Sequence, residues 1–193
     1  MQQTLDLIRH GEPVGGRLYR GNGIDDPLSD AGWEQMWAAV AERGQGWERI
    51  ITSPMLRCRA FAEALGEERG LPVTIEPRFR ELGFGDWEGL AHAVVRETRA
   101  GEYLAFRRDP VNATPPGAEP LAEFARRSRQ ALHELLDRPG RCLVVTHAGV
   151  IRSLVGEVME MPLPAIFRLK VEYAQITQLR FDEGRGTLLS HSK

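Results

Sequence analysis

The chain has 193 residues, of which 42% are hydrophobic and 27% are charged, an ordinary composition for a soluble globular protein. This length suits one compact domain, so residues 1–193 are expected to fold as a single unit. The formal charge of −2, from 25 basic and 27 acidic residues, excludes a general nucleic-acid binder, which would carry a basic excess. No run approaches the ~18 consecutive apolar residues of a membrane helix, and the first residues lack a signal-peptide pattern. We therefore expect a cytoplasmic protein without nucleic-acid or membrane partners.

The two cysteines, Cys58 and Cys142, lie far apart and show no metal-ligand spacing. Cys142 falls in an apolar run, where cysteine usually behaves as a small hydrophobic residue. Both are expected to be free structural thiols in a reducing compartment. The spacing of the other ligand types suggests no metal site, and no cofactor is expected.

Short apolar runs predict β-strands, and the segments between them predict helices. The expected strands cover residues 4–8, 48–52, 73–76 and 142–145. Ser29 is expected to cap the first helix, and Ser53 with Pro54 is expected to begin the second. An amphipathic helix is predicted over residues 121–136, and another is predicted to end near Met159.

The remaining segments complete the predicted fold. Residues 166–171 and 176–181 alternate in hydrophobicity like antiparallel edge strands. Residues 81–119 are less regular and are expected to form a lid-like excursion, too small for a core of its own. The alternation of strands and helices predicts a three-layer α/β/α sandwich with a mostly parallel central sheet and an antiparallel edge.

Two histidines end two of the predicted strands. His10 follows Arg9 and precedes Gly11, while His147 follows a continuous apolar strand. Ligands of open α/β sheets bind outside the carboxyl ends of the strands, so these side chains are expected to converge. Arg57 joins them from the first turn of a helix, where the helix dipole disfavours a cation by about 0.3–1 kcal/mol. A bound anion would relieve that repulsion.

These residue types suit phosphoryl transfer. Neutral His10 is a competent nucleophile if one ring nitrogen is free and the other donates to a carbonyl. Arg9, Arg57 and His147 could hold the phosphate, because guanidinium groups match phosphate oxygens geometrically. Close backbone approach explains a glycine at position 11.

Transfer from an ester also needs a proton for the leaving oxygen. Glu81 lies in the stretch Glu-Leu-Gly-Phe-Gly-Asp-Trp-Glu-Gly, among apolar and glycine neighbours, and is the preferred proton donor. Spacing alone does not separate Glu81 from Asp86 or Glu88.

Four ordered motifs together resemble the histidine phosphatase superfamily, also called phosphoglycerate-mutase-like. They are Arg-His-Gly-Glu at residues 9–12, Ser-Pro-Met-Leu-Arg at 53–57, the stretch at 81–89, and Thr-His-Ala-Gly at 146–149. The resemblance spans about residues 4–181. It implies a phosphoglycerate-mutase-like fold, a phosphohistidine at His10, Glu81 as proton donor and no metal. The expected substrate contacts are Arg9, Gly11, Arg20, Arg57, His147 and Ala148.

Within that superfamily the chain is similar to α-ribazole-5′-phosphate phosphatases of cobalamin synthesis, through residues 18–21, 26–29, 84–89 and 114–119. Pro13 stands where relatives usually carry Thr or Ser, and Ala118 displaces Glu119 by one residue from the common Gly-Glu-Ser pattern. The resemblance implies a phosphomonoesterase for α-ribazole 5′-phosphate. A broad-specificity phosphatase, a phosphoglycerate mutase and a non-catalytic phosphate-binding module remain alternatives, and a homodimer is left open.

Other basic residues carry no assigned role. Arg107 and Arg108 are expected on solvated faces, as are Arg126, Arg127 and Arg129. His92, His133 and His191 have no surrounding pattern.

Overall fold

A computed structural model describes residues 2–43 and 46–192. These residues form one six-stranded sheet with the order β3-β2-β4-β1-β5-β6. The strands are β1 (Gln3–Arg9), β2 (Arg49–Thr52), β3 (Val73–Ile75), β4 (Gly140–Thr146), β5 (Ile176–Asp182) and β6 (Arg185–Ser192). Strands β1 to β4 are parallel, and β5 runs antiparallel to both β1 and β6.

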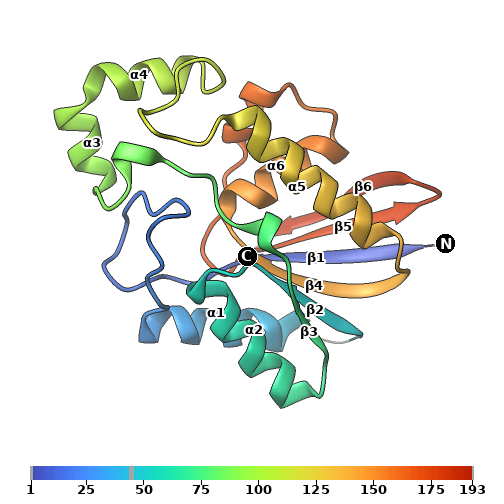
Figure 1. Ribbon diagram of the computed structural model, residues 1–193. Coiled ribbons are helices and arrows are strands. Elements are labelled where there is room, and N and C mark those ends of the chain that lie inside the picture. Colours follow the sequence, from blue (N-terminus) through green and yellow to red (C-terminus); the bar gives the residue numbers. More distant parts are fainter. Residues whose placement is uncertain (1, 44–45, 193) are drawn as a thin grey trace.

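Helices cover both faces of this sheet (Figure 1). One face carries α1 (Asp30–Arg43) and α2 (Leu56–Arg69), and the other carries α5 (Leu121–Leu136) and α6 (Ala148–Val158). The short helices α3 (His92–Thr98) and α4 (Ala100–Arg108) lie beyond one end of the strands (Figure 1). The described residues also form three 3-10 helices: η1 (Pro77–Phe79), η2 (Gly85–Trp87) and η3 (Leu163–Arg168).

The sequence of β4 explains why there are two cores. Successive side chains of a strand point to opposite faces of the sheet. Cys142 and Val144 belong to the core with α5 and α6, whereas Leu143 and Val145 belong to the core with α1 and α2. The predicted three-layer sandwich with a mostly parallel sheet and an antiparallel edge is therefore confirmed.

The predicted starts of the first two helices have different outcomes. Ser29 caps α1 as predicted, because its Oγ accepts a hydrogen bond of 3.1 Å from the N–H of Gly32. The prediction for α2 was wrong, since this helix begins at Leu56 with Met55 at its N-cap. Ser53 lies just outside the helix, where its hydroxyl contacts His147.

The predicted strand over residues 166–171 was also wrong. Much of that stretch lies in η3, and its last carbonyls accept hydrogen bonds from arginine side chains rather than from a strand. Leu169 O accepts from Arg152 Nε at 2.8 Å, and Val171 O accepts from Arg9 Nη1 at 2.7 Å. The partner of β5 is instead β6, which follows a tight turn with positive φ at Glu183 and Gly184.

The excursion at residues 81–119 has a small apolar cluster of its own. Trp87 and Val95 are fully buried and Phe106 is nearly so, and Phe84 and Phe167 pack against them. Phe84 also packs against the main core, so the excursion is joined to the body of the protein through shared aromatic contacts. The segment was expected to be too small for a core of its own; its cluster of three buried side chains is small and shares Phe84 and Phe167 with the main core.

Two further expectations concern cysteines and membranes. Cys58 and Cys142 are both buried and free, as predicted. Within the part of the chain that the structure describes, no helix is long and apolar enough to cross a membrane.

Candidate active site

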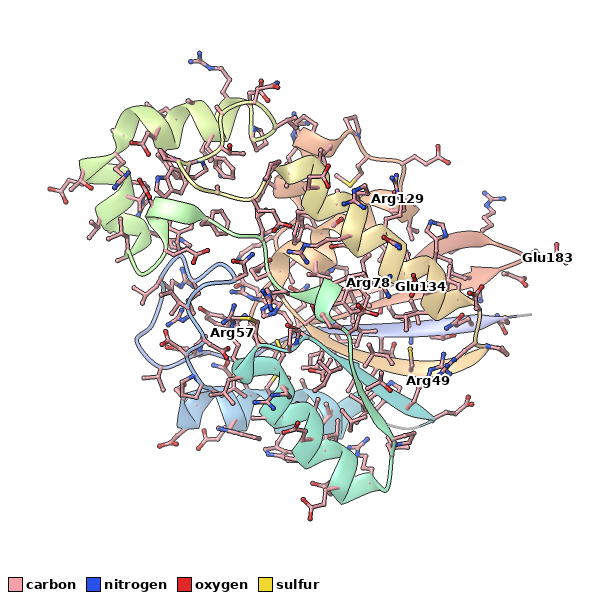
Figure 2. All side chains as sticks on the ribbon, in the orientation of Figure 1. Arg49, Arg57, Arg78, Arg129, Glu134 and Glu183 are labelled. Atoms are coloured by element: carbon pink, nitrogen blue, oxygen red, sulfur yellow. The ribbon has the colours of Figure 1, made fainter. Side chains whose placement is uncertain are left out.

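The pairing of β1 with β4 sets the two histidines side by side. Arg9 and Thr146 are paired in the parallel register, so His10 and His147 each follow directly at the carboxyl ends of neighbouring strands. Their ring centroids are 5.2 Å apart, and the rings meet edge to face. Arg57 approaches the same end of the sheet from α2 (Figure 2). The convergence expected from the sequence is therefore observed.

His10 has one ring nitrogen fixed as a donor. Nδ1 lies 2.8 Å from the carbonyl oxygen of Gly11, which can only accept, so Nδ1 carries the hydrogen. Burial, with the Arg57 and Arg9 cations, holds the pKa of His10 well below its ordinary value of 6.5. The imidazole is therefore neutral, and its Nε2 lone pair is free to act as a nucleophile.

His147 is fully buried and is held from the α2 side. Its Nε2 lies 2.7 Å from Ser53 Oγ and 3.6 Å from Cys58 Sγ. Burial and the Arg57 cation lower the pKa of His147 well below 6.5. The contact with Ser53 was missed in the sequence, where the Ser-Pro dipeptide suggested a helix start.

The two arginines have donors to spare for an anion. Arg57 is almost fully buried and donates to the carbonyls of Ile24 (2.8 Å) and Gly21 (2.9 Å), while Arg9 donates to Val171. The Nε of both arginines is buried and has no acceptor among the described residues. Each guanidinium has five N–H groups, so both arginines retain N–H groups without an acceptor among the described residues, and both line the cavity in front of His10.

Glu81 reaches the site from the segment after η1. Its Oε1 accepts from the N–H of Leu82 at 2.9 Å, and its Oε2 accepts from the N–H of Gly149 at 3.3 Å. A Cβ at position 149 would collide with this carboxylate, which explains the glycine there. Both Glu81 and Gly149 line the cavity in front of His10.

The structure separates Glu81 from the two other acids that spacing left open. Glu88 uses its carboxylate to accept backbone N–H groups from Asn22, Gly23 and Phe84. Asp86 is 58% exposed at the protein surface. Neither is among the residues that line the cavity, whereas Glu81 is.

The other predicted substrate contacts differ in position. Ala148 lines the cavity. Arg20 lines it too, but most of its side chain is buried, paired with Asp26 at 2.9 Å and bonded to backbone carbonyls of residues 14 and 16. Gly11 is not among the lining residues; a Cβ there would collide with the backbone of Gly32, so helix packing requires this glycine.

The cavity has a volume of about 470 Å³ and continues from His10 toward α3, α4 and η3, whereas the buried His147 is not among its lining residues. Its far wall combines aromatic and basic side chains, several of which the sequence left without a role. These side chains are Tyr19, Phe84, His92, Tyr103, Phe106, Arg107, Arg108, Arg152, Phe167 and Arg168. Tyr173 also lines the cavity but lies at its near end, with its ring centroid 5.8 Å from that of His10. Arg107 and Arg108 are exposed as expected, but they also face this cavity. His92 stacks on Tyr19 with ring centroids 4.1 Å apart.

These features have the chemistry that phosphoryl transfer requires. The cavity brings a neutral imidazole, arginine side chains and a carboxylate together within one concave space. Among residues 2–43 and 46–192, no three His, Cys, Asp or Glu side chains gather in a way that could hold a metal ion.

Comparison with known proteins identifies the family of the chain. The model of the histidine phosphatase superfamily (branch 1) matches residues 5–193, and the chain belongs to that family. A glucosyl-3-phosphoglycerate phosphatase of Mycobacterium tuberculosis is 36% identical over 83% of this chain and 77% of that protein. An adenosylcobalamin/α-ribazole phosphatase of Salmonella typhimurium is 32% identical over 95% of this chain and 93% of that protein. The structure of the α-ribazole phosphatase from Shigella flexneri aligns with a TM-score of 0.84 and 26% identity, covering 99% and 96% of the two chains. The chain is therefore a phosphoric monoester hydrolase of the histidine phosphatase type.

Proposed function

We propose that the chain is a metal-independent phosphomonoesterase that works through a phosphohistidine at His10. The observation that carries the proposal is the neutral, buried imidazole of His10, whose Nδ1 is occupied by Gly11 O and whose Nε2 is free. Beside it, the spare N–H groups of Arg9 and Arg57 supply the positive charge that a metal would otherwise provide.

In the first half-reaction, His10 Nε2 attacks phosphorus and the P–O bond to the alcohol breaks. Arg9, Arg57 and His147 bind the phosphoryl oxygens, and Glu81 gives its proton to the leaving oxygen. In the second, water attacks the phosphohistidine while the Glu81 carboxylate takes the proton from that water. Inorganic phosphate leaves, and both His10 and Glu81 return to their starting forms.

α-Ribazole 5′-phosphate is our first candidate substrate. The similarity to α-ribazole phosphatases over nearly the full chain supports it. The aromatic side chains of Tyr19, Phe84 and Phe106 along the cavity suit a planar heterocycle.

An ester whose alcohol is itself acidic is the second candidate. Besides Arg9, Arg20 and Arg57, the cavity is lined by four more arginines: Arg107, Arg108, Arg152 and Arg168. Glu81 is the one carboxylate among the described lining residues. The similarity to a glucosyl-3-phosphoglycerate phosphatase points the same way. This excess of positive charge favours a leaving group that carries a carboxylate.

The decisive assay measures phosphate release with excess chelator from α-ribazole 5′-phosphate, glucosyl-3-phosphoglycerate, p-nitrophenyl phosphate and 3-phosphoglycerate. We expect turnover by the wild type, none by His10→Ala, and a loss of about 10²–10³-fold in kcat for Arg57→Ala. Rapid quenching should trap an acid-labile phosphoenzyme in the wild type only.

Three results would contradict the proposal. Turnover by His10→Ala would exclude the phosphohistidine, and abolition by chelator would exclude a metal-independent reaction. Isomerisation of 3-phosphoglycerate without net phosphate release would identify a mutase. The ratio of kcat/KM between the first two esters decides which substrate candidate is correct.

A further inference from the structure

Arg127 was expected on a solvated face of α5, but only 18% of its side chain is exposed. All five of its N–H groups have acceptors. Nε and Nη2 hold the two carboxylate oxygens of Glu119 at 2.7 and 2.8 Å. Nη1 donates to the carbonyls of Arg78 (2.5 Å) and Arg80 (2.7 Å), and Nη2 also donates to the carbonyl of Glu81 at 3.0 Å. The guanidinium is thus a rigid fork with every donor in use.

These contacts surround the residue that gives the proton. The carbonyls of residues 78, 80 and 81 belong to the short segment that carries Glu81 into the cavity. That segment contains η1 followed by extended backbone, so α-helical hydrogen bonds do not fix it. Arg127 supplies the fixation from a long helix, where the guanidinium also lies 4.7 Å from the Phe124 ring centroid.

Glu119 holds the other side of the same segment. Its Oε2 accepts from the N–H of Gly83 at 3.3 Å, and its own N–H donates to Gly83 O at 3.1 Å. Glu119, which lies one residue later than the glutamate of the common Gly-Glu-Ser pattern, therefore has a structural role. Its carboxylate binds Arg127 and the backbone just after Glu81.

We propose that Arg127, bound to Glu119, is a positioning residue that aims the Glu81 carboxyl at the leaving oxygen. This inference rests on the proposed function. Arg127 does not line the cavity, and its hydrogen bonds reach the site through the backbone that carries Glu81. Its positive charge also helps to lower the pKa of His147, an effect that the Arg127→Lys variant keeps. Its loss should impair proton donation and leave attack by His10 intact.

The leaving group distinguishes this role from a purely structural one. p-Nitrophenolate departs without a proton, whereas the alkoxide of glycerol 2-phosphate needs one. The value of kcat/KM covers only the steps up to release of the alcohol. Arg127→Ala should therefore lower kcat/KM for glycerol 2-phosphate by about 10–100-fold and that for p-nitrophenyl phosphate by less than about threefold.

Two further variants test the route of the effect. Arg127→Lys keeps the positive charge but cannot reach three carbonyls and a carboxylate, so it should show the same selective loss. In a Glu81→Gln background, Arg127→Ala should cause little additional loss on the alkyl ester, because both substitutions remove one function. Arg126→Lys is the matched control, since Arg126 is 60% exposed and pairs only with Glu123 among the described residues.

The outcomes separate this inference from the proposed function. An inactive wild-type enzyme, or full activity of His10→Ala, would overturn the proposed function. An active wild type with equal losses on both esters in Arg127→Lys, or with additive losses in the double variant, would overturn the positioning role. If Arg127→Ala does not fold, Arg127→Lys and Glu119→Gln carry the test, with folding checked by thermal melting.

Discussion

His10 and His147 are both buried and neutral, and at the scale of single residues this state has a thermodynamic consequence. Burial and nearby arginines disfavour the imidazolium form, so each pKa in the folded protein lies well below 6.5. An unfolded chain has no such restriction, and its histidines titrate near pH 6.5. The histidines that suit phosphoryl transfer therefore make the fold sensitive to acid.

We predict that stability falls as the pH drops below about 6.5. In that range both histidines are protonated in the unfolded chain but stay neutral in the folded protein. The free energy of unfolding therefore decreases by roughly 1.4 kcal/mol per pH unit for each histidine. The contribution is complete above pH 6.5, and the decrease stops once the folded pKa values are reached. Urea midpoints at pH 7.5, 6.5 and 5.5 measure it.

The variants His10→Asn and His147→Asn provide the control for this pH dependence. Each should flatten the decrease below pH 6.5 by about one histidine's share, whatever its effect on stability at pH 7.5. An unchanged pH dependence in both variants would show that other groups cause the loss.

Gly149 is the other residue whose identity the site demands. We predict that Gly149→Ala displaces the Glu81 carboxylate, because the added methyl group would collide with it. The expected result is a loss of about 10²-fold in kcat/KM for an alkyl phosphate, the scale of a misplaced general acid. Gly101→Ala is the matched control, since a Cβ there meets nothing within 4 Å and a helical alanine should stabilise α4 by about 0.5–1 kcal/mol. Equal activity in the two variants would contradict the collision.

Among the elements, α3 and α4 differ from the rest because they pack mainly on their own aromatic cluster. Trp87, Val95 and Phe106 form this cluster, and Phe106 also lines the cavity. A unit held by few buried side chains opens at lower free energy than the central sheet. Through Phe106, the same cluster forms part of the far wall of the cavity.

We predict that α3 and α4 exchange their amide hydrogens well before β1 and β4 in native conditions. Phe106→Ala should speed exchange across residues 92–108 and leave β4 unchanged, because it removes a buried ring from the local cluster. Hydrogen exchange read by mass spectrometry tests this, with Leu104→Ala as control, since Leu104 is 62% exposed on α4. Simultaneous acceleration in β4 would mean that the two regions unfold together.

For the molecule as a whole, the charge is unevenly placed. The chain carries a formal charge of −2, yet the described lining of the cavity contains seven arginines and one carboxylate: Arg9, Arg20, Arg57, Arg107, Arg108, Arg152 and Arg168 against Glu81. Such a concave positive region concentrates anions in front of the nucleophile.

We predict that kcat/KM for a phosphate ester decreases steadily as NaCl rises from 0.02 to 0.3 M. Salt shortens the Debye length to about 10 Å at 0.1 M and so screens the exposed arginines from an approaching dianion. Arg168→Gln should reduce the slope, whereas Arg180→Gln, at an exposed position of β5 outside the cavity, should not. Salt-independent kcat/KM in the wild type would argue against steering.

The sequence predicted secondary structure correctly where local patterns determine it, and incorrectly where polar groups form hydrogen bonds with partners distant in the chain. Strand patterns predicted the sheet edge that brings His10 and His147 together, because those strands obey local periodicity. The first helical residue of α2 and the strand at 166–171 were mispredicted. In both places partners distant in sequence use the polar groups: His147 binds Ser53, and Arg9 and Arg152 bind the carbonyls of residues 171 and 169.

The sequence predicted the residues that carry the chemistry of the site, but not the residues that hold them in position. Arg9, Arg57 and Glu81 were expected from residue type and motif, and they do line the cavity. Arg127, Arg152 and Tyr173 were not expected, since nothing local distinguishes a surface arginine from one that binds carbonyls across the fold. The ring centroid of Tyr173 lies 4.0 Å from the Arg9 guanidinium carbon, although the two residues are 164 positions apart in the chain.

The hydrogen bonds between Gly83 and Glu119 have a consequence for how such a protein can change over generations. They join the two ends of the excursion, so the chain leaves and rejoins the body at one closed point. Because the ends are already held together, lengthening or replacing the intervening segment adds only a slowly growing closure entropy. His10 and His147 stay fixed by strand pairing outside it. Mutations in the excursion can therefore change which alcohol the cavity accepts, while the two histidines keep their positions.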